Sequence, residues 1–187
     1  MGDITSEEIA AIVQRAKCIH SEAEVEEAID ILAEQIRERL GDKNPILLCV
    51  MNGGFILTAG LATRLQFPLQ LDYVHATRYR EETSGAELQW KSHPSIDMEG
   101  RVVIVVDDIF DEGITLEKVV SYCTEQNVAK VYTAVLINKI HNRKQSQLQV
   151  DFIGLEIEDL YLYGYGMDYK GYLRNAAGIF AIADEDK

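Results

Sequence analysis

The hydrophobic pattern at the start of the chain is helical. One amphipathic helix is expected to begin at Ser6, and a second after Ser21, which forms a capping box with Glu24. The second helix is marked by apolar residues three and four positions apart, at Val25, Ala28, Ile29, Leu32 and Ile36. Gly41 is expected to end it, because glycine is common just beyond a helix C-terminus.

Farther along, short apolar runs alternate with helical segments. Strands are predicted at 46–50, 69–75, 102–106, 131–137, 152–155 and 179–183, and helices at 55–65 and 115–126. Residues 102–106 are five consecutive aliphatics, which is typical of a strand buried on both faces of a parallel sheet. The alternation predicts an α/β fold with a mainly parallel sheet flanked by helices.

Residues 77–100 interrupt this alternation. The segment is polar and has no lasting period. Long irregular segments inside compact domains are usually lids or are disordered, so a mobile loop is predicted at roughly 77–98.

Composition narrows the class of protein. The 187 residues suit one domain, and 47% hydrophobic and 26% charged residues are ordinary for a soluble globular protein. The net charge of −13 argues against a nucleic-acid-binding surface. No segment approaches the length of a membrane span, and the N-terminus lacks a secretory signal, so a cytoplasmic protein without a membrane partner is expected. Cys18, Cys49 and Cys123 lack the spacing of a zinc site or a disulfide framework.

Candidate chemistry begins where the 102–106 strand is predicted to end. Asp107 and Asp108 follow it, and then come Asp111, Gly113 and Thr115. Ligands of parallel sheets bind past the carboxyl ends of strands, and the first turn of a helix can hold phosphate through its N–H groups. Acids for a metal and amides for phosphate suggest a phosphorylated sugar bound with magnesium.

Two other interpretations of the acidic pair are open at this point. It could be a charge pair before a helix, which contributes only ~0.3–1 kcal/mol. Receiver domains also place an acidic pair after a strand, with a lysine on a later strand. However, a receiver has this pair after its first strand, whereas Asp107 follows about a hundred residues. A receiver also has no need of the phosphate-binding loop that Gly113 and Thr115 suggest.

The wider sequence resembles a known family. Residues 105–116 look like the phosphoribosyl-pyrophosphate (PRPP) motif of type I phosphoribosyltransferases. Four other places resemble the hypoxanthine-guanine branch of that family: 51–54, its pyrophosphate loop; 77–79 with 83–85, its mobile loop; 136–139, the strand that ends in a purine-recognising lysine; and 151–157 with 161–169 and Arg174, its base-binding hood. These matches occur in order from about residue 46 to the C-terminus.

The resemblance implies a fold and an activity. It implies a single phosphoribosyltransferase domain over 1–187. Its core would span roughly 40–150, and a small C-terminal hood would span roughly 151–175. The N-terminus is a candidate further part of the hood. The implied reaction is purine salvage: PRPP and hypoxanthine or guanine give IMP or GMP and pyrophosphate, with Mg²⁺ as cofactor. A homodimer or homotetramer is implied as well.

It also implies roles for individual residues. Asp107 and Asp108 would hold the sugar hydroxyls and the water shell of the metal, and Asp168 would contact a second Mg²⁺. Asp111 would exchange a proton with the five-membered ring of the purine. The 5′-phosphate would be held by the loop of Asp111, Glu112, Gly113, Ile114 and Thr115.

The remaining implied roles concern the base, the pyrophosphate and the lid. Lys139 would donate to the purine O6, Tyr161 would stack on the base, and Leu162 and Asp168 would line its pocket. By periodicity alone, Lys139 is an exposed strand-end lysine. Pyrophosphate would contact Asn52, Gly53 and Arg174, and Arg78 and Tyr79 would close over the reaction. His75 and His141 flank strand ends and are assigned no role.

Three positions depart from the family pattern. Glu112 stands where many relatives have a small hydroxyl residue, while Ile114 and Asn52 stand where lysine is common. We expect Glu112 to turn its carboxylate to solvent or a nearby cation. Two alternatives therefore stay open: a xanthine-preferring phosphoribosyltransferase, or a non-catalytic regulator that binds nucleotides or RNA on the same fold. The negative charge opposes RNA binding, and the retained acids oppose loss of catalysis.

Overall fold

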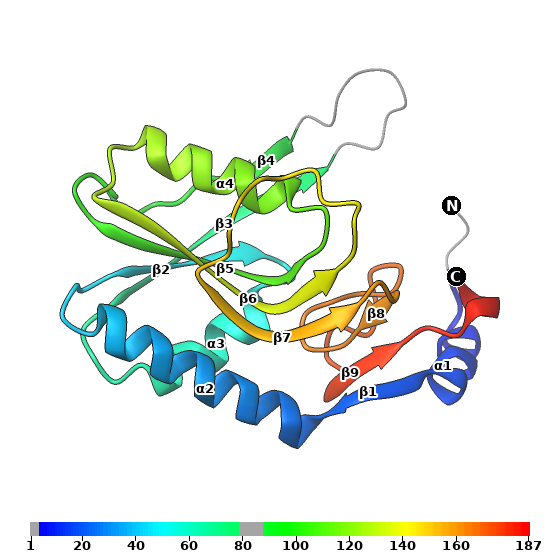
Figure 1. Cartoon of the computed structure of the whole chain (residues 1–187). Helices are drawn as coiled ribbons and strands as arrows, with labels where there is room; N and C mark the ends of the chain where they lie inside the picture. Colours follow the sequence, from blue (N-terminus) through cyan, green and yellow to red (C-terminus); the bar gives the residue numbers. More distant parts are fainter. Residues whose placement is uncertain (1–3, 79–87) are drawn as a thin grey trace.

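A six-stranded sheet forms the centre of the computed structural model, which describes residues 4–78 and 88–187 (Figure 1). The strand order is β4–β3–β2–β5–β6–β7. The parallel strands are β2 (Ile46–Met51), β3 (Gln70–Arg78), β5 (Val102–Phe110), β6 (Lys130–Ile140) and β7 (Phe152–Glu158). Only the edge strand β4 (Leu88–Ser92) is antiparallel to its neighbour in this sheet. The predicted α/β class with a mainly parallel sheet is confirmed.

Helices cover both faces of this sheet. α2 (Glu22–Leu40) and α3 (Phe55–Arg64) pack on one face, and α4 (Ile114–Glu125) packs on the other (Figure 1). α2 begins at the predicted capping box of Ser21 and Glu24. It ends before Gly41, as predicted, but this glycine has a right-handed backbone, with φ of −60°. The N-terminal cap of α2 is therefore the one predicted from the sequence, whereas its C-terminal glycine lacks the left-handed backbone that is common at this position.

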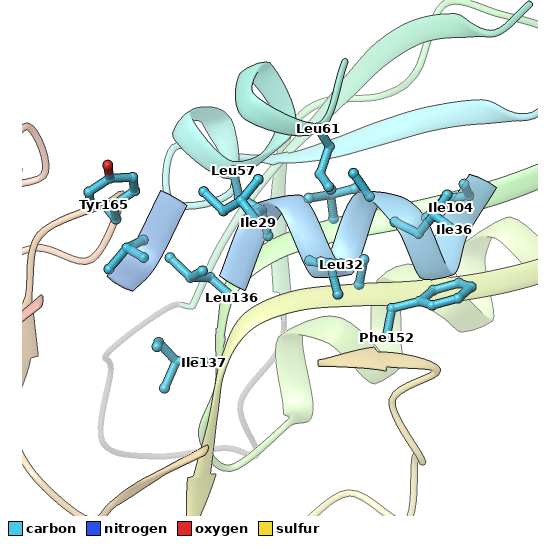
Figure 2. Packing of buried hydrophobic residues seen from close by; sticks show 14 of the residues in the cluster. Ile29, Leu32, Ile36, Leu57, Leu61, Ile104, Leu136, Ile137, Phe152 and Tyr165 are labelled. Atoms are coloured by element: carbon cyan, nitrogen blue, oxygen red, sulfur yellow. The ribbon is translucent and has the colours of Figure 1, made fainter. Parts of the chain in front are cut away.

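The aliphatic run of β5 is buried on both faces, as its pattern predicts. Because side chains alternate along a strand, Ile104 and Val106 join the cluster under α2 and α3, while Val103 and Val105 join the cluster under α4. The first cluster is centred on apolar residues from two helices and three strands (Figure 2): Ile29, Leu32, Ile36, Leu57, Leu61, Ile104, Leu136 and Phe152. Packing on both faces holds β5 in place at the centre of the core.

β5 continues four residues beyond the predicted end of the strand. Its pairing with β6 extends to Ile109 and Phe110, which lie opposite Ile137 and Asn138. Asp107 and Asp108 therefore lie on the strand itself and not in a turn after it. Polar residues are tolerated at this end because the neighbouring strand β2 stops pairing with β5 at Val106, and a cleft opens there.

A second, three-stranded sheet joins the two ends of the chain. Its order is β1 (Lys17–Ser21), β9 (Gly178–Ala181) and β8 (Leu162–Tyr163), all antiparallel. α1 (Ser6–Arg15) and the 3₁₀ helix η1 (Asp184–Asp186) lie beside it and next to each other (Figure 1). The predicted hood segment, 151–175, begins with β7, which belongs to the main sheet because it pairs with β6. The hood sheet itself uses residues from both ends.

Three short strands were not predicted: β1, β4 and β8. β4 lies inside the segment predicted to be irregular, and its sequence, Leu-Gln-Trp-Lys-Ser, has one polar face suited to a sheet edge. Trp90 of β4 stacks on His93 and contacts Tyr122 of α4, which holds this edge against the helix. The other part of the predicted mobile loop, 79–87, lies outside the described residues. Among the described helices, none is long and apolar enough to cross a membrane.

Candidate active site

A cleft of about 640 Å³ opens at the carboxyl ends of β2, β5 and β6, below the loop that follows β8. Most of the residues predicted to act in the site line it, although they come from four separate parts of the chain. They are Asn52, Gly53, Asp107, Asp108, Asp111, Glu112, Gly113, Thr115, Lys139, Tyr161, Leu162, Asp168 and Arg174. The structure thus brings together the residues predicted for sugar, phosphate and base.

Asp107 and Asp108 are buried at the floor of this cleft. Burial raises the pKa of both carboxyls, and the neighbouring charge of Asp108 raises the pKa of Asp107 further, well above its ordinary value. Arg174 opposes this, with Nη1 3.9 Å from Asp108 Oδ2. Two adjacent buried carboxylates cost free energy unless a cation compensates them. Their oxygen ligands suit Mg²⁺, so these residues fit the predicted metal.

The loop after β8 rests directly on the loop after β2. A Cβ atom added to Gly166 would lie 2.1 Å from the carbonyl oxygen of Gly53, and one added to Gly53 would lie 2.3 Å from Asp108 Oδ2. Arg174 donates to the carbonyl of Gly166 at 2.5 Å and pairs with Asp168 Oδ1 at 2.5 Å. The loop after β8 can approach the Gly53 carbonyl this closely only because residue 166 is a glycine, and Gly53 in turn leaves room for the Asp108 carboxylate.

The loop between β5 and α4 has the geometry of an anion-binding site. Gly113, the N-cap of α4, has a left-handed backbone with φ of +85° and no side chain with which to cap the helix. A Cβ at Gly113 would lie 2.5 Å from the Phe110 ring and 2.7 Å from Ser146 Cβ, so only glycine fits. Gly113, Thr115 and Leu116 line the cleft, so the N-terminus of α4 borders it, and a phosphate there would be stabilised by the helix N-terminus.

Two departures from the family pattern lie in this loop. Arg143 Nη1 is 3.7 Å from Glu112 Oε1, so the Glu112 carboxylate faces a nearby cation, as expected. Ile114 is half-buried on α4, and it is not among the described residues that line the cleft. Its predicted contact with PRPP therefore rests on its backbone amide.

Asp111 lies in a cluster of charged side chains at the edge of the cleft. Lys139 Nζ donates to its Oδ2 at 3.0 Å, and His141 Nε2 lies 2.7 Å from its Oδ1. Arg143 Nη2 is 3.4 Å from the same Oδ1. Burial raises the pKa of Asp111, but the hydrogen bonds and charges of these three neighbours outweigh burial and hold the pKa below its ordinary value. Asp111 is therefore ionised in this arrangement.

Asp159 completes the cluster from the loop after β7. Arg143 binds it through Nε at 3.0 Å and Nη2 at 2.5 Å, and Lys139 Nζ is 3.6 Å from its Oδ1. Asp111, His141 and Asp159 each offer one atom within 4.8 Å of the others, a spacing that a metal could use. Because Lys139 and Arg143 pair with both carboxylates, we assign the cluster to ion pairing and not to metal binding.

The predicted base pocket lies beside this cluster. Tyr161 is 39% exposed at the cleft and contacts Tyr169 at a ring-centroid distance of 5.7 Å, whereas Leu162 is buried. Lys139 is buried, which corrects the alternative interpretation of an exposed strand-end lysine. It lies inside the sheet, because β6 pairs with β5 up to Asn138 and Lys139 itself pairs with Ile157 of β7.

Sequence reasoning did not assign every residue of the site. Met51, His75, Ile109 and Met167 also line the cleft. His141 was noted at a strand end but given no role. Arg143 and Asp159 were missed, although Arg143 lies just after Lys139 in the sequence, which could have indicated it. The Arg78 side chain and Tyr79 lie outside the described part of the structure, so the lid role of this pair stays a prediction.

Comparisons with known proteins identify the family to which the chain belongs. The family described as "Phosphoribosyl transferase domain" matches residues 16–170 of the chain, which includes every strand lining the cleft. The match excludes the receiver-domain interpretation, because it covers most of the chain and includes the acidic pair.

Relatives and solved structures give the same result. The chain is 28% identical over 159 residues to a hypoxanthine-guanine-xanthine phosphoribosyltransferase of Tritrichomonas foetus, with 85% of this chain and 87% of that protein covered. It is 32% identical over 161 residues to a hypoxanthine-guanine phosphoribosyltransferase of Crithidia fasciculata, with 82% and 76% covered. A structure of Trypanosoma cruzi hypoxanthine phosphoribosyl transferase superposes with a TM-score of 0.84 at 25% identity, with 90% and 92% covered.

Proposed function

The chain belongs to the phosphoribosyltransferase family, in its hypoxanthine-guanine branch, and we propose that it transfers the 5-phosphoribosyl group of PRPP to hypoxanthine or guanine. The products are IMP or GMP and pyrophosphate. One observation carries the proposal: the lysine suited to a 6-oxopurine and the acid suited to its ring N–H contact each other in the cleft, at 3.0 Å. The phosphate loop and the acidic pair line the same cleft.

PRPP would be bound by groups on both sides of the cleft. The loop 111–115 would take the 5′-phosphate, and Asp107 and Asp108 would hold the ribose hydroxyls. Asn52, Gly53 and Arg174 would contact the pyrophosphate, with the arginine as a bidentate anion ligand. Asp107, Asp108 and Asp168 would hold Mg²⁺, which when bound neutralises charge on the departing pyrophosphate.

The chemical step exchanges one bond at C1′ for another. The bond from C1′ to pyrophosphate breaks, and its electron pair leaves with pyrophosphate, while a ring nitrogen of the purine forms the new bond. The proton on the five-membered ring passes to Asp111. A general base of this kind typically contributes about 10²–10⁴ in rate.

Lys139 would select the base. It is paired with Asp111, and it would turn to donate to the O6 carbonyl of a bound purine. Adenine has an amino group at this position, which cannot accept a hydrogen bond from the lysine, so adenine would bind without this contact. Tyr161 would stack on the ring and Leu162 would contact it.

Xanthine is a second candidate base. It is supported by the similarity to the Tritrichomonas foetus protein, whose name includes xanthine. We further propose action in the cytoplasm as a homodimer or homotetramer, which rests on the family resemblance alone.

The proposed activity is tested by incubating the protein with PRPP, Mg²⁺ and each of hypoxanthine, guanine, xanthine and adenine. We expect nucleotide and pyrophosphate from hypoxanthine or guanine and little from adenine. A preference for xanthine would replace the substrate assignment. No product from any base, with PRPP binding intact, would favour the non-catalytic regulator.

A further inference from the structure

His141 is an unassigned side chain in direct contact with the proposed base. It lies one residue beyond β6, and its imidazole is only 4% exposed. Nε2 is 2.7 Å from Asp111 Oδ1, which is closer than Lys139 or Arg143 comes to the same carboxylate. A buried imidazole at this distance restricts the orientation of the Asp111 carboxylate.

The other nitrogen of the ring identifies the protonated atom. The backbone N–H of Arg143 donates to His141 Nδ1 at 3.0 Å, so Nδ1 acts as an acceptor and carries no proton. A neutral ring then has its hydrogen on Nε2, and Nε2 donates to Asp111. The chain makes this arrangement locally, because Arg143 is only two residues beyond His141.

The two oxygens of Asp111 therefore have different partners. Lys139 binds Oδ2, whereas His141 and the more distant Arg143 bind Oδ1. When Lys139 turns to the purine O6, Oδ2 loses its donor and becomes available to the ring N–H. Oδ1 keeps its donor, so the carboxylate stays in place.

We propose that His141 is a positioning residue for the proposed phosphoribosyl transfer: a neutral Nε2–H donor that fixes Asp111 through Oδ1 and leaves Oδ2 for the purine proton. This rests on the proposed function and deepens it. A neutral donor suits the task because a cation there would stabilise the ionised carboxylate more strongly and oppose proton uptake. Arg143 is cationic, but at 3.4 Å it is farther from Oδ1 and binds Asp159 through two nitrogens.

The same geometry excludes His141 as a proton relay. A relay would need to pass the proton out through Nδ1, and that atom is occupied by the Arg143 amide. Proton uptake thus ends at Asp111. Several charged groups face this pair from neighbouring segments: Lys139, Arg143, Lys144, Glu112 and Asp159.

The tautomer is tested first, on the wild-type protein without purine or PRPP. Long-range ¹H–¹⁵N NMR at pH 7–8 should show His141 with a protonated Nε2 and an unprotonated Nδ1. This measurement does not depend on activity. A proton on Nδ1, or a doubly protonated ring, would overturn the proposal whether or not the protein is a transferase.

Kinetics then test the positioning role. His141→Leu removes the donor, and we expect kcat/KM for hypoxanthine to fall about tenfold, because small misplacement of a reacting group is costly. The acidic limb of the kcat/KM profile should move to higher pH, since a donor that lowers the pKa of Asp111 is gone. The KM for PRPP should stay unchanged.

Two variants control for a purely structural effect. His141→Gln keeps an N–H at the end of the side chain and should restore most of the activity and the acidic limb. His20→Leu removes a histidine of β1 that does not line the cleft and should match wild type. If the wild type is active and His141→Leu keeps its rate and its acidic limb, the positioning role is wrong while the proposed function stands. If no base is converted by the wild type, the proposed function fails instead.

Discussion

At the scale of single residues, the site depends on how Asp111 shares its two oxygens. Lys139, His141 and Arg143 together hold its pKa below the ordinary value, which makes the free carboxylate a weak base. Binding of a 6-oxopurine would draw Lys139 away and thereby raise the basicity of Asp111 at the moment when it must accept a proton. Recognition of the purine and activation of Asp111 as the proton acceptor are thus linked through Lys139.

Asp111→Asn tests the proton acceptor. The amide keeps the shape of the side chain but takes up no proton, so we expect turnover with hypoxanthine to fall at least tenfold. PRPP binding, measured by calorimetry with Mg²⁺, should persist because the phosphate loop acts mainly through backbone amides. Unchanged turnover would remove Asp111 from the role of base.

Lys139→Ala tests base selection. Loss of a buried donor typically costs about 1–3 kcal/mol, so the ratio of kcat/KM for hypoxanthine to that for adenine should fall by roughly tenfold or more. Lys130→Ala, at the exposed opposite end of β6, is the matched control and should leave this ratio unchanged. If Lys139→Ala still discriminates against adenine as the wild type does, recognition lies elsewhere in the cleft.

At the scale of elements, the cleft is formed where the loop after β8 meets the loop after β2. Gly166 makes this approach possible, and Arg174 reinforces it by donating to the Gly166 carbonyl. Tyr165 adds a second attachment, because its hydroxyl donates to Glu26 of α2 at 2.6 Å. Glu26 in turn pairs with Arg64 of α3 at 2.5 Å. The position of Arg174 and Asp168 thus depends on helices far away in the sequence.

Gly166→Ala and Gly171→Ala separate steric contact from backbone strain. Both glycines have positive φ, +107° and +89°, but an added Cβ meets Gly53 O at 2.1 Å in the first and nothing within 4 Å in the second. Gly171→Ala should cost about 1–3 kcal/mol of unfolding free energy from strain alone. Gly166→Ala should cost more unfolding free energy and also weaken PRPP binding about tenfold, because the loop after β8 must move away from Gly53. Equal effects of both variants on PRPP affinity would contradict this assignment.

At the scale of the whole molecule, the cleft lies between the main sheet and the loop after β8. Asp107, Asp108 and the phosphate loop belong to the β5–α4 segment, whereas Asp168 and Arg174 follow β8. A ligand that contacts both sides adds connections between them. Its binding free energy therefore contributes to the stability of the folded chain.

Thermal unfolding with PRPP and Mg²⁺ measures this contribution. Ligand at a hundred times its Kd should add about 2.7 kcal/mol, which for a chain of this size raises Tm by roughly 5–10 °C. Removing Mg²⁺ with EDTA should abolish most of the shift, and Asp108→Asn should show little shift at any Mg²⁺ concentration. An equal shift by PRPP with and without Mg²⁺ would argue against the acidic pair as a metal site.

The sequence by itself determined the layers of the fold and the floor of the cleft. Hydrophobic periodicity is a local property, so it identified α2, the doubly buried strand β5 and the position of Asp107 and Asp108 near its carboxyl end. The glycine before α4 likewise indicated the phosphate loop. These features depend on residues that are neighbours in the chain, and simple spacing rules describe them well.

Only the tertiary structure decided which side chains meet. Phe110 pairs with Asn138 in the β5–β6 register, and this register brings Asp111 beside Lys139 and His141. The hood sheet pairs β1 with β9 across almost the whole chain, and Gly166 meets Gly53, which is also far away in the sequence. Register and loop contacts are set by packing over long sequence distances, and periodicity along the chain does not encode that packing.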